Sequence, residues 1–152
     1  MAAKIKPKEP SVTRPRAARF VDWALAVVAL LGLADSTFLT VAHLTGDDAV
    51  CGSAIGCSTV LGSAYATIGK IPTATLGVVA YFTVFSLAVL SAFGYARMRG
   101  LLTILVGVMF AASLYFLYLQ TFVLHAFCPF CLLSAALTFV LAGLLLAFPA
   151  VR

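Results

Sequence analysis

Charged residues are scarce in this sequence: they fill 10% of its 152 positions, against about 25% in soluble globular domains. Hydrophobic residues fill 63%, where about 45–50% is usual. So apolar a chain cannot cover its surface with polar groups in water, which argues against a soluble enzyme and a disordered chain. The net charge of +5 does not indicate nucleic-acid binding, because the basic residues gather at one end of the sequence. The composition predicts an integral membrane protein.

Polar interruptions are rare in four stretches, each close to the roughly 20 apolar residues that a bilayer-crossing helix needs. They show neither a polar stripe at helical spacing nor the alternation of a membrane β-barrel. The predicted spans are Phe20–Leu44, Thr73–Tyr95, Leu101–Leu124 and Pro129–Pro149. Small residues permit close approach of the helices: Gly77, Ala80, Gly107 and Ala111. We expect an all-α fold, a four-helix membrane bundle over residues 20–152, after a basic tail over residues 1–19.

Lysine and arginine are nearly absent from two of the segments that join the spans. Segment 45–72 has only Lys70, and the link between spans three and four has none. Because positive residues in short flanks stay cytoplasmic, we expect both termini and residues 96–100 inside, in a bacterial plasma membrane. The first apolar stretch is too long for a signal peptide, so an uncleaved first helix is expected. The basic residues on the inner side are Lys4, Lys6, Lys8, Arg14, Arg16, Arg19, Arg97, Arg99 and Arg152.

There are four cysteines, and all of them fall on the predicted outer side. They form two groups, Cys51 with Cys57 and Cys128 with Cys131. Cys-Pro-Phe-Cys opens the fourth helix, with Pro129 at the first helical position, where proline is favoured. Both cysteines then share one face of a helix start, where free N–H groups can lower a thiol pKa to about 3.5–7.5. This pattern is typical of a dithiol that closes and opens as a disulfide.

Other uses of the cysteines match the sequence less well. Attachment of c-type haem needs a histidine after the second cysteine, and Leu132 stands there. A zinc site would join the two groups, but the spacing between Cys51 and Cys57 is wider than usual, so no metal is predicted. Two structural disulfides in a non-enzymatic tetraspanning protein are the plainest alternative, and this alternative stays open.

Glycine and serine residues surround Cys51 and Cys57, which predicts a loop pair able to reach more than one partner. Next to a pair at a helix start, this favours an electron relay by thiol–disulfide exchange. The sequence holds no haem-ligand pair, dinucleotide fingerprint or phosphate loop. A lipid-soluble quinone is therefore the electron acceptor by elimination.

Further motifs accompany the cysteines in a fixed order. They are Ser36-Thr37-Phe38-Leu39-Thr40 with His43, the stretch from Cys57 to Thr67, Ile71-Pro72 with Leu76-Gly77, and Cys-x-x-Cys at the last helix. From helix one to helix four the chain resembles the vitamin K epoxide reductase family, most of all its bacterial members. The resemblance implies a four-helix bundle around a quinone of the menaquinone, ubiquinone or phylloquinone type. It also implies a half-helix over Cys57–Tyr65.

The resemblance further implies a role for each cysteine. Cys51 would exchange with a thioredoxin-like (DsbA-like) protein, which would be a separate chain because no thioredoxin domain is fused here. Cys57 would pass electrons to Cys128, and Cys131 would lie nearest the quinone. In a second bacterial family with this activity the two cysteine pairs come in the reverse order, which disfavours that family.

The resemblance also assigns three residues to the quinone pocket. Ser63 matches a family serine close to the active centre. Vertebrate members carry Asn and Tyr where this chain has Thr73 and Ala135, at positions that contact vitamin K epoxide. We therefore expect this protein to reduce a plain quinone in preference to vitamin K epoxide. Quinone reduction would be coupled to reoxidation of the partner.

Four polar residues near the outer side have competing interpretations. Asp35 lies within the first predicted span, where it either carries protons to the quinone or bonds a buried hydroxyl group. For His43 and His125, a place at the membrane interface competes with a role in proton transfer, and the interface is expected. Gln120 is expected to bond another helix in preference to the quinone.

Overall fold

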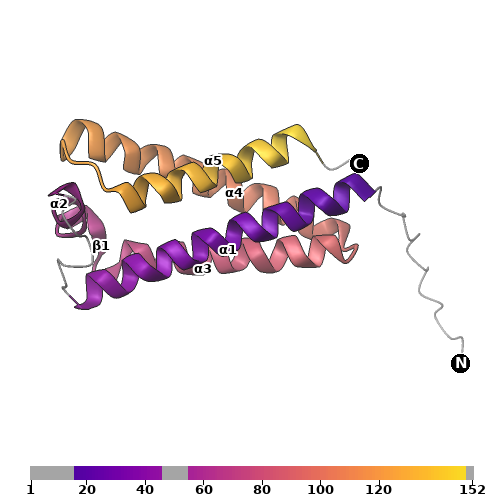
Figure 1. Ribbon diagram of the computed structural model, residues 1–152, viewed down its shortest axis with the longest axis horizontal. Coiled ribbons are helices and arrows are strands. Elements are labelled where there is room, and N and C mark those ends of the chain that lie inside the picture. The colour runs from indigo at the N-terminus through magenta and orange to yellow at the C-terminus, as the bar shows by residue number, and fades with distance from the viewer. Residues whose placement is uncertain (1–15, 46–54, 150–152) are drawn as a thin grey trace, which may run out of the picture.

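The computed structural model describes residues 16–45 and 55–149 (Figure 1). Within these ranges, four helices are long and apolar enough to cross a membrane, so the predicted four-helix membrane bundle is confirmed. The elements in chain order are α1 Arg16–Thr45, α2 Ile55–Leu61, η2 Ala64–Ala66, β1 Thr67–Ile68, β2 Ile71–Pro72, α3 Thr73–Ala92, α4 Ala96–Tyr118, η3 Leu119–Val123 and α5 Pro129–Ala147.

The four long helices lie side by side and alternate in direction, as Figure 1 shows. The start of α1, the end of α5 and the α3–α4 link lie at one end of the bundle, which we call the terminal end. The short helix α2, the antiparallel β1–β2 hairpin and the start of α5 lie at the other, which we call the cysteine end. This arrangement gathers the short elements where the chemistry was expected.

The core of the bundle joins all four long helices. Leu25 of α1, Val84 of α3, Leu102 of α4 and Leu141 of α5 belong to one hydrophobic cluster and are fully buried. Many large apolar side chains point outward instead, such as Val108, which is 62% exposed. A surface of this kind is suited to a solvent of lipid tails.

Helices α1 and α3 pack most closely, through glycines. A Cβ added to Gly32 would lie 2.2 Å from the ring of Tyr81, and one added to Gly77 would lie 3.0 Å from Ser36 Oγ. The predicted role of Gly77 is therefore confirmed. The same prediction is wrong for Gly107, which has nothing near its added Cβ, because this part of α4 faces outward.

Several element boundaries differ from the sequence prediction, and three of them matter most. Helix α1 begins at Arg16 instead of Phe20, and α4 begins at Ala96 instead of Leu101. The predicted half-helix over Cys57–Tyr65 is shorter in the structure. Helix α2 ends at Leu61, and a separate turn, η2, follows. A glycine and a serine at positions 62 and 63 end the helix, since both residue types disfavour a helix interior.

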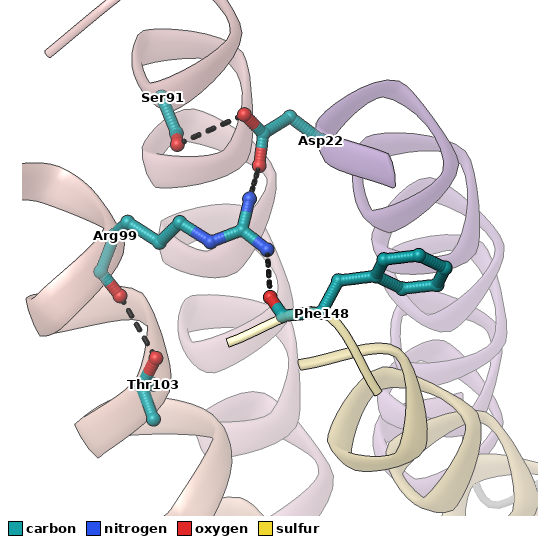
Figure 2. A network of polar contacts seen from close by, with 5 residues as sticks. All are labelled: Asp22, Ser91, Arg99, Thr103 and Phe148. Atoms are coloured by element: carbon teal, nitrogen blue, oxygen red, sulfur yellow. Dashed lines mark hydrogen bonds and ion pairs between the residues drawn. The ribbon is translucent and has the colours of Figure 1, made fainter. Parts of the chain in front are cut away.

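A network of polar contacts holds the four long helices together at the terminal end (Figure 2). Arg99 of α4 pairs with Asp22 of α1 and donates from Nη2 to the carbonyl of Phe148, the C-cap of α5, over 2.6 Å. Ser91 of α3 donates to Asp22 Oδ2 over 3.1 Å. The basic residue that the sequence analysis placed in a link is thus buried inside the bundle.

Candidate active site

Three of the four cysteines are among the described residues, and all three lie at the cysteine end. Cys57 of α2 is fully buried and disulfide-bonded. Cys128, the N-cap of α5, is also fully buried, and Cys131 is partly buried one turn further on. Both carry free thiols. Cys51 lies outside the described residues, so its predicted role stays a prediction.

Close backbone contact brings the segments of Cys57 and Cys128 together. A Cβ added to Gly56 would lie 2.2 Å from the carbonyl oxygen of Phe127. Only a residue without a side chain fits there. The two backbones therefore come closest one residue before Cys57 and one residue before Cys128. Cys57 and Cys128 then share a small hydrophobic cluster with Leu39 of α1.

The start of α5 has the geometry that the sequence predicts. Cys128 is its N-cap, with φ −94° and ψ 117°, and Pro129 is the first helical residue. The backbone N–H of Cys128 donates to Gln120 Oε1 over 3.1 Å. Gln120 is buried in η3, a turn of π-helix that ends α4, so its predicted bond to another helix is confirmed.

The Cys128 thiol is the more acidic member of this pair. A hydrogen bond from the Cys131 thiol lowers the pKa of Cys128 to about 7, although burial raises it. The backbone N–H groups of Phe130 and Cys131 lower this pKa as well, while the charge of Asp35 raises it. The site therefore supports a thiolate at Cys128 near neutral pH, in agreement with the expectation for a cysteine at a helix start.

A cavity of about 560 Å³ lies next to Cys131. Residues of all four long helices line it, as do residues of α2, η2 and the hairpin. The predicted pocket residues Ser63, Thr73 and Ala135 all line this same cavity, as does His43. The structure thus brings the three predicted pocket residues to one cavity from three separate parts of the chain, and His43 joins them from α1. Their contact with a ligand stays a prediction.

The hydroxyl groups of Ser63 and Thr73 support the wall of the cavity. Ser63 Oγ donates to the carbonyl of Val60 over 2.7 Å, at the end of α2. Thr73 Oγ1 donates to the carbonyl of Tyr65 over 3.2 Å, which ties the start of α3 to η2. The first bond is local to the end of α2, and the second joins a short element of the cysteine end to a long helix.

Tyr81 is a cavity residue that the sequence analysis missed. Its hydroxyl donates to the carbonyl of Ser134 over 2.7 Å and lies 2.9 Å from Thr138 Oγ1. The only signal in the sequence was a tyrosine inside an otherwise apolar span. Of the aromatic residues on α4 and η3, Tyr115 and Phe116 line the cavity.

The fold and the cysteine pair at the helix start define a multi-pass membrane protein with a buried thiol centre. The sequence model of the Vitamin K epoxide reductase family matches residues 23–146, and the chain belongs to this family. It is also similar to the thiol-disulfide oxidoreductase LTO1 of Arabidopsis thaliana, with 35% identity over 114 residues. The matched region is 69% of this chain and 30% of that relative's length.

Proposed function

We propose that this protein is a thiol-disulfide oxidoreductase that reoxidises a thioredoxin-like partner and delivers the electrons to a membrane quinone. Electrons would pass from Cys51 and Cys57 to Cys128 and Cys131. The observation that carries the proposal is the close approach of Gly56 to Phe127, which sets a disulfide-bonded cysteine beside a free pair. The similarity to a thiol-disulfide oxidoreductase supports the same class of reaction.

The relay would run by thiol–disulfide exchange, which conserves electrons at each step. A partner thiolate reduces the loop disulfide and leaves as the partner's own disulfide. The Cys57 thiolate then attacks Cys128 of the inner disulfide, and Cys131 leaves as a thiolate. Finally Cys51 attacks Cys57, and Cys128 leaves. The free thiols of Cys128 and Cys131 match the stage at which both electrons have reached the inner pair.

The cavity beside Cys131 suits a quinone in size and chemistry. Ligand pockets for small molecules commonly measure about 300–1,000 Å³ and are mostly apolar with a few polar groups. The cavity here measures about 560 Å³, its lining is mostly apolar, and Tyr81 and Ser134 are among its hydroxyl-bearing residues. A quinone there would supply the two-electron acceptor, and the residues around it would orient its ring against Cys131.

A trapped intermediate tests the relay. The double variant Cys51→Ala, Cys131→Ala lacks both thiols that would resolve a disulfide between Cys57 and Cys128. We expect this bridge to accumulate under mild oxidation. A protease site inserted at Gly94, in the α3–α4 link, should leave the two halves joined on a non-reducing gel after cleavage. Halves that separate would contradict the relay and favour two structural disulfides.

A third substitution tests the geometry of the approach. Gly56→Ala in the double variant should lower the yield of the bridge several-fold, because the new Cβ would meet the Phe127 backbone. Alanine favours a helix over glycine, so α2 itself is not weakened by the change. Gly100→Ala is the matched control, since nothing lies within 4 Å of its added Cβ. An equal yield in all three proteins would show that the approach does not govern the exchange.

A further inference from the structure

Asp35 is a buried carboxyl group within α1 for which the relay has no use. It is 8% exposed, and its Oδ2 atom has no hydrogen-bond partner among the described residues. Burial of a carboxylate without a partner is costly, in a membrane span above all. Ionisable residues kept at such positions usually mark paths for protons, ions or substrates.

The surroundings of Asp35 include a residue of the cavity beside Cys131 and a residue at the start of α5. Gly32, one turn earlier on the same face of α1, lies against the ring of Tyr81, which lines the quinone cavity. On its other side, Asp35 lines a second cavity of about 380 Å³ together with Phe130, the residue before Cys131. The rings of Phe38 and Phe130, with centroids 5.0 Å apart, also line this second cavity.

Three titratable groups lie within electrostatic range of Asp35 among the described residues. They are Cys128 and Cys131 at the start of α5 and Tyr81 on α3. Two negative charges repel strongly in so apolar a site. A thiolate at Cys131 and a carboxylate at Asp35 would therefore repel each other. Transfer of the thiol proton to the carboxylate removes this repulsion.

We propose that Asp35 is the general base of the quinone step: its Oδ2 atom accepts the proton that Cys131 loses when the inner pair closes to a disulfide. This inference rests on the proposed function. Counted from the fully protonated pair, closure breaks two S–H bonds, forms one S–S bond and releases two electrons and two protons; where Cys128 is already a thiolate, its proton has left beforehand. The quinone takes up two electrons and two protons. The proton of Cys131 would pass through Asp35, while the proton of Cys128 and the second proton of the quinone exchange with water.

The test is a single turnover of the full-length protein in detergent. The protein is reduced with a small dithiol, freed of it, and mixed with a short-chain benzoquinone or naphthoquinone. Quinone absorbance and alkylation of the thiols are followed together. We expect Asp35→Asn to slow both signals about 10²-fold, since general base catalysis contributes about 10²–10⁴-fold. Asp35→Glu keeps a carboxylate and should lie within about tenfold of the parent protein.

The pH profile separates a proton acceptor from a structural residue. Between pH 8 and 9, above the pKa of Cys128, the rate of Asp35→Asn should rise about tenfold, because hydroxide must then take the Cys131 proton. The parent rate should stay nearly flat. Thr37→Val is the control, since Thr37 is exposed on the same helix and bonds only the carbonyl of Leu33. It should match the parent protein.

The possible outcomes distinguish a failure of this inference from a failure of the proposed function. If the parent protein does not reduce the quinone, the proposed function is wrong, and the role of Asp35 is wrong with it. Parent-like rates in Asp35→Asn would overturn the role of Asp35 alone. A slow Asp35→Asn variant that also loses the Cys57–Cys128 bridge in the trapping background would overturn it too, because the defect would then be structural. A slow variant that keeps the bridge and gains the pH dependence supports the proposal.

Discussion

At the scale of single residues, the hydrogen bond from Cys131 to Cys128 does the most to determine the chemistry. It is available only in the reduced pair, and it lowers the pKa of Cys128 to about 7. A stabilised thiolate favours the reduced form, so the inner disulfide becomes a better oxidant of the loop pair. A thiol of low pKa also leaves more readily, which speeds release of Cys128 from its bridge to Cys57.

This acidity predicts how the inner pair responds to pH. Below the pKa of Cys128, about 7, the inner pair and an ordinary dithiol each take up two protons on reduction, so the equilibrium between them does not depend on pH. Above it, Cys128 stays ionised while an ordinary thiol, with a pKa of about 8.5, is still protonated. The equilibrium constant for reduction of the inner disulfide by dithiothreitol should therefore not change from pH 6 to 7. It should rise about tenfold per pH unit between roughly 7 and 8.5.

The measurement uses a variant in which Cys51 and Cys57 are serine, so that only the inner pair titrates. The reduced fraction is read by alkylation at fixed ratios of reduced to oxidised dithiothreitol. A constant that does not change between pH 6 and pH 8.5 would contradict the role assigned to the hydrogen bond from Cys131.

At the scale of elements, the terminal-end network of Asp22, Ser91, Arg99 and Phe148 joins all four long helices at one point (Figure 2). Asp22 and Ser91 are fully buried and Arg99 is 4% exposed. Loss of one charge from a buried pair leaves the other without compensation, whereas loss of both is often close to neutral. The network should thus be sensitive to single substitutions and tolerant of double ones.

Arg99→Met should lower the stability of the folded bundle by about 3–5 kcal/mol, because it removes the positive charge that pairs with the buried Asp22 carboxylate. Adding Asp22→Leu should recover most of that loss. Arg97→Met is the control, because Arg97 is exposed and its replacement should have little effect. Unfolding in detergent with increasing denaturant provides the comparison. A double variant no more stable than Arg99→Met would show that the charge pair is not what the single substitution breaks.

The same network shows what the sequence could and could not predict. Long uninterrupted apolar runs locate the four spans well, because bilayer thickness dictates their length. The arginine at 99 was assigned to a link, since nothing local indicates that a residue 77 positions away would neutralise it. The tight fit of Gly56 on Phe127 depends equally on a distant backbone. Ser63, Thr73 and Ala135 reached one cavity through family resemblance, not through any spacing in this chain.

At the scale of the whole molecule, the two ends of the bundle differ in charge and chemistry. The terminal end carries Arg16, Arg19 and Arg97, while Lys70 is the one lysine or arginine described at the cysteine end. Short segments rich in lysine and arginine remain cytoplasmic. Disulfides persist on the opposite side of a plasma membrane, in an oxidising compartment. Both arguments predict that the cysteine end faces outside, although one rests on charge and the other on redox chemistry.

This orientation predicts a clear labelling pattern in intact cells. A thiol reagent that does not cross membranes should label Cys51 once the loop pair is reduced, because segment 45–72 would face outward. A cysteine introduced at Arg97, in a background without the four native cysteines, should be labelled only after the cells are opened. Arg97 is exposed, so protection of that site in intact cells would reflect the membrane and not burial in the bundle. A cysteine at Gly69, at the exposed tip of the β1–β2 hairpin in the same background, is the matched outer control.

Labelling of position 97 with protection of position 69 would reverse the orientation. The loop pair would then face the reducing cytoplasm, where a disulfide-forming relay would have no oxidising compartment to serve.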